Sequence, residues 1–79
     1  MMSYKIHKYL YNLKIYLYNG ECIEESNLDQ EAYNNFNKYL DDKFTYLQQA
    51  NGFTWLNTAS IEKVECIKKL ISIEEKFIQ

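Results

Sequence analysis

Two Asn-Gly pairs, Asn19-Gly20 and Asn51-Gly52, constrain this sequence more than any other feature. They contain both of its glycines, and the chain has no proline. Asn-Gly between alternating apolar segments is the strongest short-range signal of a β-hairpin, because both residues tolerate the positive φ angles of a type I′ turn. Each pair is flanked here by residues rich in Tyr, Phe, Ile and Leu. The sequence therefore predicts two hairpins.

The first hairpin is predicted from residues 3–18 and 21–25. Apolar and aromatic residues occupy both parities of residues 3–18, which is typical of a strand with two partly apolar faces. The second hairpin is predicted from residues 43–50 and 53–57. Its aromatic residues share a parity within each arm, so we expect cross-strand aromatic packing among Phe44, Tyr46, Phe53 and Trp55.

A helix is predicted between the hairpins, over residues 28–41. Ser26 or Asn27 is placed to cap it, and the acidic Asp29 and Glu31 suit the positive end of a helix dipole. The opposite face is polar, so the helix is expected to pack one side on a sheet. The apolar stripe consists of Leu28, Ala32, Phe36, Tyr39 and Leu40.

The last segment, residues 60–78, fits a helix that Ser60 caps, although a strand is the alternative. Apolar residues recur there at spacings of three or four, which favours the helix. The fold predicted from the sequence is α+β: a small antiparallel sheet of two Asn-Gly hairpins, a helix at about 28–41 and a C-terminal helix (or strand). At 79 residues the chain is expected to form a single domain, 1–79.

The residues that support catalysis or metal binding are scarce, so we expect no enzyme activity, no catalytic residue, no metal and no cofactor. His7 is the only histidine, and both glycines fall in turns, which leaves no phosphate-binding loop. The nine basic residues are all lysine. The absence of arginine argues against sequence-specific DNA binding, which relies on bidentate guanidinium contacts.

The N-terminal segment has no uninterrupted apolar core of a signal peptide, and no stretch approaches the length needed to cross a bilayer. We therefore expect a cytoplasmic protein with no membrane contact. In that compartment Cys22 and Cys66 are expected to be reduced thiols, in or near a core.

Charge is unevenly placed along the chain. Residues 21–42 hold seven carboxylates against one lysine, Lys38, although the net charge of the whole chain is only −2. Such a block steers encounter with basic partners, while an ordinary solvated face is the plain alternative. The predicted partner-binding residues are Glu24, Glu25, Asp29, Glu31, Asp41 and Asp42, with Tyr33 and Tyr39 as aromatic anchors.

The chain is also expected to form a homo-oligomer. A core of this size supplies only about 3 to 5 kcal/mol, and small proteins often gain the rest by association. The eight tyrosines, four phenylalanines and one tryptophan exceed what so small a core encloses. The predicted oligomer interface is an exposed strand edge or a C-terminal stripe formed by Ile67, Leu70, Ile71 and Phe77.

In overall character this short, acidic, tyrosine-rich chain resembles the small accessory proteins of phages and mobile elements, including anti-defence proteins of the anti-CRISPR type. The resemblance rests on length, charge and composition, and it implies inhibition by occlusion. The function predicted on this basis is that of a non-enzymatic inhibitor or accessory protein. Its acidic, tyrosine-rich surface would cover a larger, basic, nucleic-acid-handling protein.

Two other functions are weighed beside this one. In the first, an oligomer binds or sequesters a nucleotide-like small ligand through Lys14, Tyr16 and Tyr18, since lysine pairs with phosphate while a ring stacks on a base. In the second, the segments YLYNGECIE and FTWLNTASIEKVE resemble the strand-turn-strand rhythm of small Sm-like barrels, which implies RNA binding.

Overall fold

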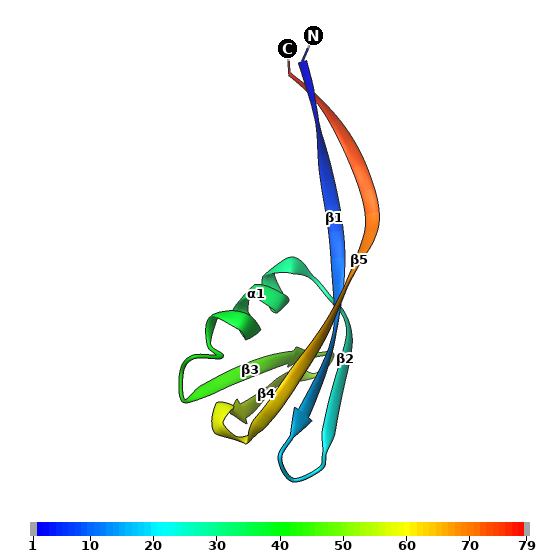
Figure 1. Cartoon of the computed structure of the whole chain (residues 1–79). Coiled ribbons are helices and arrows are strands. Elements are labelled where there is room, and N and C mark those ends of the chain that lie inside the picture. The colour runs from blue at the N-terminus through cyan, green and yellow to red at the C-terminus, as the bar shows by residue number, and fades with distance from the viewer. Residues whose placement is uncertain (1, 79) are drawn as a thin grey trace.

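Two antiparallel sheets and one helix make up the structure, a computed structural model that describes residues 2–78 (Figure 1). The larger sheet has the strand order β2-β1-β5, and the smaller is a separate β3–β4 hairpin. The two predicted hairpins therefore belong to different sheets and not to one. In chain order the elements are β1 (Met2–Leu17), β2 (Cys22–Leu28), α1 (Gln30–Lys38), β3 (Phe44–Gln49), β4 (Gly52–Asn57), a 3₁₀ turn (Thr58–Ser60) and β5 (Ile61–Ile78).

The core lies on one face of β1, here called the inner face of the larger sheet. Tyr11, Leu13 and Ile15 alternate along β1 and are buried, as the side-chain period of a strand requires. Helix α1 and the β3–β4 hairpin cover this face (Figure 1). The other buried apolar residues of the core are Leu28, Ala32, Phe36, Leu47 and Leu56.

The helix is shorter than residues 28–41, because β2 continues through Leu28. Asn27 has a φ of 61°, and its backbone N–H donates to Asn12 Oδ1 at 2.9 Å, which fixes a bulge against β1. The predicted caps Ser26 and Asn27 thus lie in β2. Asp29 is the N-cap, since its side chain accepts from the backbone N–H of Ala32 at 2.8 Å.

The Asn-Gly pairs do form the two hairpins, but not with the predicted type I′ turns. Asn19 and Asn51 both have negative φ angles, while Gly20 and Gly52 have φ angles of 91° and 134°. In the first turn, the N–H of Gly20 donates to Leu17 O at 3.0 Å and the N–H of Leu17 donates to Glu21 O at 2.9 Å. This is a three-residue loop in which glycine alone adopts the left-handed conformation.

The C-terminal segment is an 18-residue strand, β5, so the preference for a helix was wrong. The spacing of three residues between its apolar side chains is compatible with a strand, because both faces of β5 carry apolar residues. Val64 lies opposite Ile15 on the inner face, whereas Ile67 lies opposite Asn12 on the other face. The central strand β1 requires hydrogen-bonding partners on both edges, and β5 supplies the second one.

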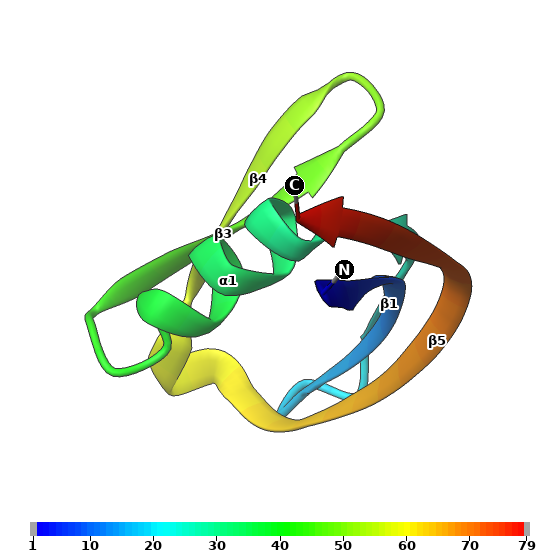
Figure 2. The same cartoon turned by 90° about the horizontal axis from the view of Figure 1, so that it is seen from above.

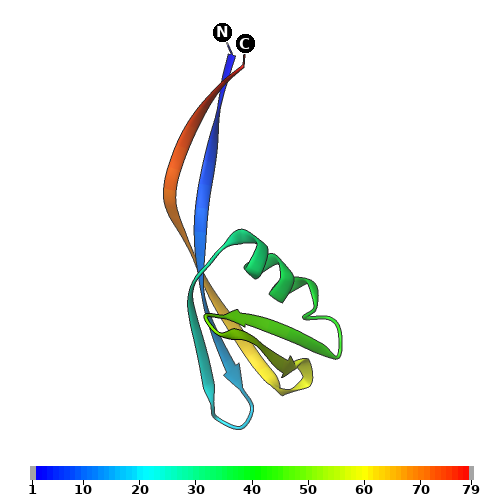
Figure 3. The ribbon, with the colours of Figure 1, turned by 180° about the vertical axis from the view of Figure 1, so that it is seen from behind.

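The N-terminal part of β1 and the C-terminal part of β5 project from the rest of the structure as a two-stranded arm (Figures 1 and 3). Pairing with β2 stops at Tyr11, so from Met2 to Leu10 β1 pairs with β5 alone among the described strands. The radius of gyration is 15.8 Å, against about 11.6 Å for a compact chain of this length. Met2 lies opposite Ile78, which puts both ends of the described chain at the tip.

Replacing Phe36 by Ala tests the placement of the core. The side chain is fully buried, so Phe36→Ala is expected to lower the free energy of unfolding by about 3 to 5 kcal/mol. Phe53→Ala is the matched control, because the same atoms are removed from a side chain that is 62% exposed. Urea unfolding followed by circular dichroism measures both, and equal losses would contradict this core.

Replacing Thr45 by Val tests the link between α1 and β3. Thr45 is buried, and its hydroxyl donates to the carbonyl oxygen of Phe36 at 2.8 Å. Thr45→Val leaves that buried carbonyl without its donor, at an expected cost of about 1 to 3 kcal/mol. Urea unfolding of Thr45→Ser, which keeps the hydroxyl, separates loss of the hydrogen bond from loss of the methyl group. The bond is unimportant if the valine variant proves the more stable of the two.

Candidate interaction surface

Four aromatic rings gather on the outward face of the smaller sheet and form what we call the aromatic cluster: Tyr39, Tyr46, Phe53 and Trp55. Tyr46 is central, with ring centroids 5.3 Å from Phe53, 5.4 Å from Trp55 and 5.7 Å from Tyr39. Tyr46 and Trp55 lie directly opposite each other on β3 and β4, which confirms the predicted cross-strand aromatic packing for Tyr46, Phe53 and Trp55. The prediction was wrong for Phe44, which lies opposite Asn57. Tyr39 joins them from the C-cap of α1.

The alternation of β3 and β4 turns this cluster toward solvent. Thr45, Leu47 and Leu56 point inward and are buried, so the residues between them face outward. Phe53 is 62% exposed and Trp55 is 68% exposed, and together with Tyr46 they line a shallow hollow of about 260 Å³. Figure 2 shows the β3–β4 hairpin reaching past α1 and β5. Clustered exposed rings of this kind mark interaction surfaces in soluble proteins.

Charged side chains of both signs border the cluster. The Lys38 ammonium lies 5.4 Å from the Tyr39 ring centroid. Asp41 and Asp42 lie on the exposed connection between α1 and β3. Within residues 2–78 neither carboxylate takes part in an ion pair. Both remain available to a partner that approaches the cluster.

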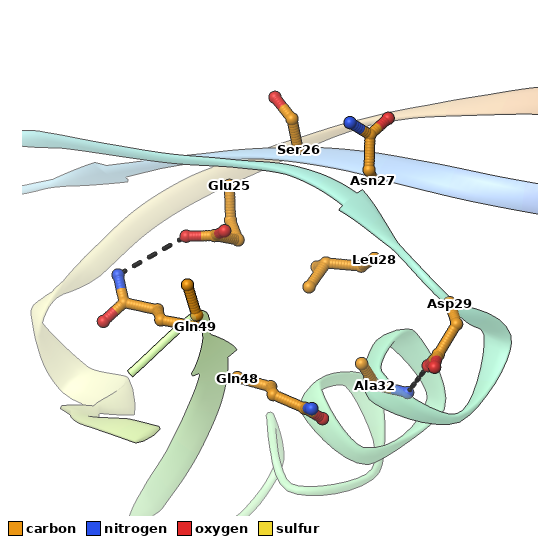
Figure 4. A pocket seen from close by; sticks show the side chains of 9 residues that line it. Glu25, Ser26, Asn27, Leu28, Asp29, Ala32, Gln48 and Gln49 are labelled. Atoms are coloured by element: carbon orange, nitrogen blue, oxygen red, sulfur yellow. Dashed lines mark hydrogen bonds between the residues drawn. The ribbon is translucent and has the colours of Figure 1, made fainter. Parts of the chain in front are cut away.

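A second hollow, of about 280 Å³, lies between β2, the start of α1 and the end of β3 (Figure 4). Glu25 points into it and accepts a hydrogen bond of 3.4 Å from Gln49 Nε2, while Asp29 is engaged in capping the helix. Ser26 and Asn27 point to the other side of β2 (Figure 4). Each of these two carboxylates thus has one oxygen already hydrogen-bonded within the fold.

The structure does not bring the predicted acidic residues together. Glu24 lies on the outer face of the larger sheet, where its carboxylate is 3.3 Å from Lys14 Nζ. Glu31 is exposed in the first turn of α1. Tyr33 is stacked on Tyr11 at 4.0 Å between ring centroids and so supports the core. Of the predicted partner-binding residues, only Tyr39, Asp41 and Asp42 belong to the aromatic cluster or its border.

The residues predicted to bind a small ligand are largely engaged with one another. The Tyr16 ring lies between two ammonium groups, 5.5 Å from Lys14 Nζ and 4.6 Å from Lys63 Nζ. Hydrogen bonding to Tyr16, and then to Glu24, raises the pKa of Lys14 above its ordinary value. Tyr18 is exposed in the first turn. No enclosed anion site results from this arrangement.

The apolar residues predicted to form an oligomer interface are all exposed, on β5 and not on a helix. Leu70 and Phe77 lie on the face that continues the inner face, opposite Tyr9 and Ser3, whereas Ile67 lies on the outer face. Ile71 is the extra residue of a bulge between the pairs Lys8–Ser72 and Tyr9–Leu70. They do not form one stripe, because strand alternation distributes them over two faces.

The thiols and the single histidine are far apart. On adjacent strands Cys66 lies opposite Leu13, and His7 lies opposite Ile73. Leu13 and His7 are six residues apart on β1, so Cys66 and His7 are about 20 Å apart along the sheet. Both cysteines are free thiols, as expected, but both are exposed and neither is among the buried residues of the core. No group of metal-ligating side chains occurs among residues 2–78. None of their helices is long and apolar enough to cross a membrane.

The sequence predicted the packing of Tyr46, Phe53 and Trp55 but assigned none of the three to a binding site; of the cluster, only Tyr39 was predicted to bind a partner. The signal was present in the shared parity of Phe53 and Trp55, whose neighbours Thr54 and Leu56 face the core. No family model, curated protein or solved structure matches this chain.

Proposed function

We propose that this protein is a non-enzymatic binding protein that covers part of the surface of a larger, basic protein. The aromatic cluster is the centre of contact in this proposal. The observation that carries it is the exposure of Phe53 and Trp55, at 62% and 68%, beside the half-buried ring of Tyr46. Exposing such rings to water is unfavourable, and a partner that covers them removes that cost.

The composition of the cluster supports a protein as the partner. Tryptophan and tyrosine are enriched among the residues that dominate binding energy, because they bury large rigid areas at a small cost in side-chain entropy. The rings of Tyr39, Tyr46 and Trp55 are held by one another and by two strands. A surface ordered in this way before binding loses little conformational freedom on association.

The border of the cluster supports a basic partner. Asp41 and Asp42 are exposed next to Tyr39, and they make no ion pair within the described residues. Carboxylates at such a rim mainly raise the rate of association with a positive surface. Proteins that handle nucleic acid present such surfaces, so occlusion of one of them is the form of inhibition that we propose.

Affinity capture tests the cluster. The wild-type chain, immobilised, is exposed to lysate of the source organism beside two variants, Trp55→Ala and Tyr18→Ala. Tyr18 is the matched control, because it is an aromatic residue of similar exposure, 70% against 68%, in the turn between β1 and β2. We expect one captured protein to be lost with Trp55→Ala and retained with Tyr18→Ala. Retention by both variants contradicts the assignment.

The captured partner, once purified, separates the roles of rings and carboxylates. Trp55→Ala is expected to raise the dissociation rate by at least about tenfold, since a buried anchor acts mainly on the dissociation rate. Asp41→Asn with Asp42→Asn is expected to slow association severalfold and to reduce its dependence on salt. An association rate that is indifferent both to salt and to these amides contradicts the role of the carboxylates, though not that of the cluster.

A further inference from the structure

Strand β5 has one free edge along its whole described length. It pairs only with β1, in the order β2-β1-β5, so its other row of backbone N–H and C=O groups meets no strand among residues 2–78. A long free edge that carries exposed apolar side chains is a template for pairing with another strand. Leu70, Ile71 and Ile73 are each between 51% and 53% exposed along this edge.

The charge pattern of this edge is complementary to the same edge of a second, antiparallel copy. Residues 68–75 read Lys-Lys-Leu-Ile-Ser-Ile-Glu-Glu, two lysines and two glutamates placed symmetrically about the bond between Ile71 and Ser72. A second copy laid antiparallel about that point places Lys68 opposite Glu75, Lys69 opposite Glu74 and Leu70 opposite Ile73. Opposite charges directly across two antiparallel strands stabilise their pairing.

Strand alternation alone would forbid this register. In a regular strand Lys68 and Glu75 point to opposite faces, because their numbers differ by an odd number. The bulge at Ile71 removes the conflict. Lys68 and Glu75 lie opposite Tyr11 and Lys5 of β1, which share one face of the sheet.

The same holds for the other complementary pair. Lys69 and Glu74 lie opposite Leu10 and Ile6 of β1, which share the other face. The single irregularity in this part of β5 thus sits at the point of symmetry. It brings each charge to the face on which its counterpart in a second copy lies.

Three of these four charged side chains have no carboxylate or ammonium partner within residues 2–78 that would compete. Lys68 lies over the Tyr9 ring at 4.0 Å, and Lys69 donates to Asn27 Oδ1 at 3.3 Å. Neither takes part in an ion pair within the described chain, and neither does Glu75, while Glu74 is 3.9 Å from Lys76. Strand edges often use charge to repel foreign strands. Here the arrangement repels strands of like charge and matches a copy of itself.

We infer that two copies of this chain associate through antiparallel pairing of their β5 edges, with a two-fold axis between Ile71 and Ser72. The product is a continuous sheet of six strands, ordered β2-β1-β5 and then β5-β1-β2 of the second copy. Each copy uses its β5 edge once, so the assembly closes as a dimer. The aromatic cluster lies on the separate β3–β4 sheet and takes no part in this contact.

A designed disulfide tests the register. In this register Cys66 faces Phe77 of the second copy, on the same face of the sheet. The chain with Cys22→Ser and Phe77→Cys is expected to form a covalent dimer in mild oxidant, joined by two disulfides. The two thiols of one chain are eleven residues apart on one strand, about 35 Å, which is far beyond the reach of a disulfide.

Cys22→Ser with Lys76→Cys is the matched control, because position 76 lies opposite Tyr4 of β1 on the other face and is directed away from Cys66 of the second copy. Equal cross-linking of both variants contradicts the register.

Charge reversal tests the interaction itself, with mass measured by sedimentation. The wild type is expected at twice 9.5 kDa. Lys68→Glu with Lys69→Glu places glutamates opposite glutamates, and Glu74→Lys with Glu75→Lys places lysines opposite lysines. Each double variant alone is expected to dimerise at least about tenfold more weakly. An equimolar mixture of the two is expected to form a heterodimer, since every facing pair then has opposite charges.

Circular dichroism of each double variant checks that it is folded, and recovery of the dimer in the mixture shows that folding is not what was lost. A wild-type mass of 9.5 kDa at millimolar concentration overturns the inference. Dimers that persist in both double variants overturn the β5 edge as the contact.

Discussion

The rest of the structure depends on β1 being paired along both of its edges from Tyr11 to Tyr16. Its inner face carries Tyr11, Leu13 and Ile15, the residues on which α1 and the β3–β4 hairpin pack. Strand β2 satisfies one edge over Tyr11 to Tyr16, and β5 satisfies the other from Met2 to Leu17. A buried strand with an unpaired edge would leave backbone polar groups without partners, so the core requires both neighbours.

The fold was predictable where local chemistry decides the structure. Gly20 and Gly52 end up with the positive φ angles that made the Asn-Gly pairs informative, and the apolar stripe of α1 buries Ala32 and Phe36. It was not predictable where a distant segment decides. Residues 61–78 form a strand because β1 lies beside them, a partner about sixty residues away in the sequence. Their spacing of three results from two faces and a bulge, which the sequence alone does not distinguish from a helical stripe.

The candidate site divides in the same way. The mutual packing of Tyr46 and Trp55 follows from hairpin register, which turn position sets. A common acidic surface does not follow from the proximity of these residues in the sequence, because residues 21–42 run through a strand, a helix cap and a helix. Glu24 meets a lysine on the outer face of the sheet, Asp29 holds the helix end, and Asp42 lies beyond α1. A run of charge along the chain becomes one surface only when a single element carries it.

Pairing of the first strand with the last has a consequence for the order of folding. The β3–β4 hairpin and α1 are local structures that close over a few residues, whereas the arm joins Met2 to Ile78. Loop closure over such a distance is slow, and its entropic cost precedes any gain from the pairing. Until residues 61–78 have been synthesised, β1 lacks the partner for one of its two edges. During that interval the nascent chain carries a long unpaired strand, which is the feature that chaperones recognise and that aggregation exploits.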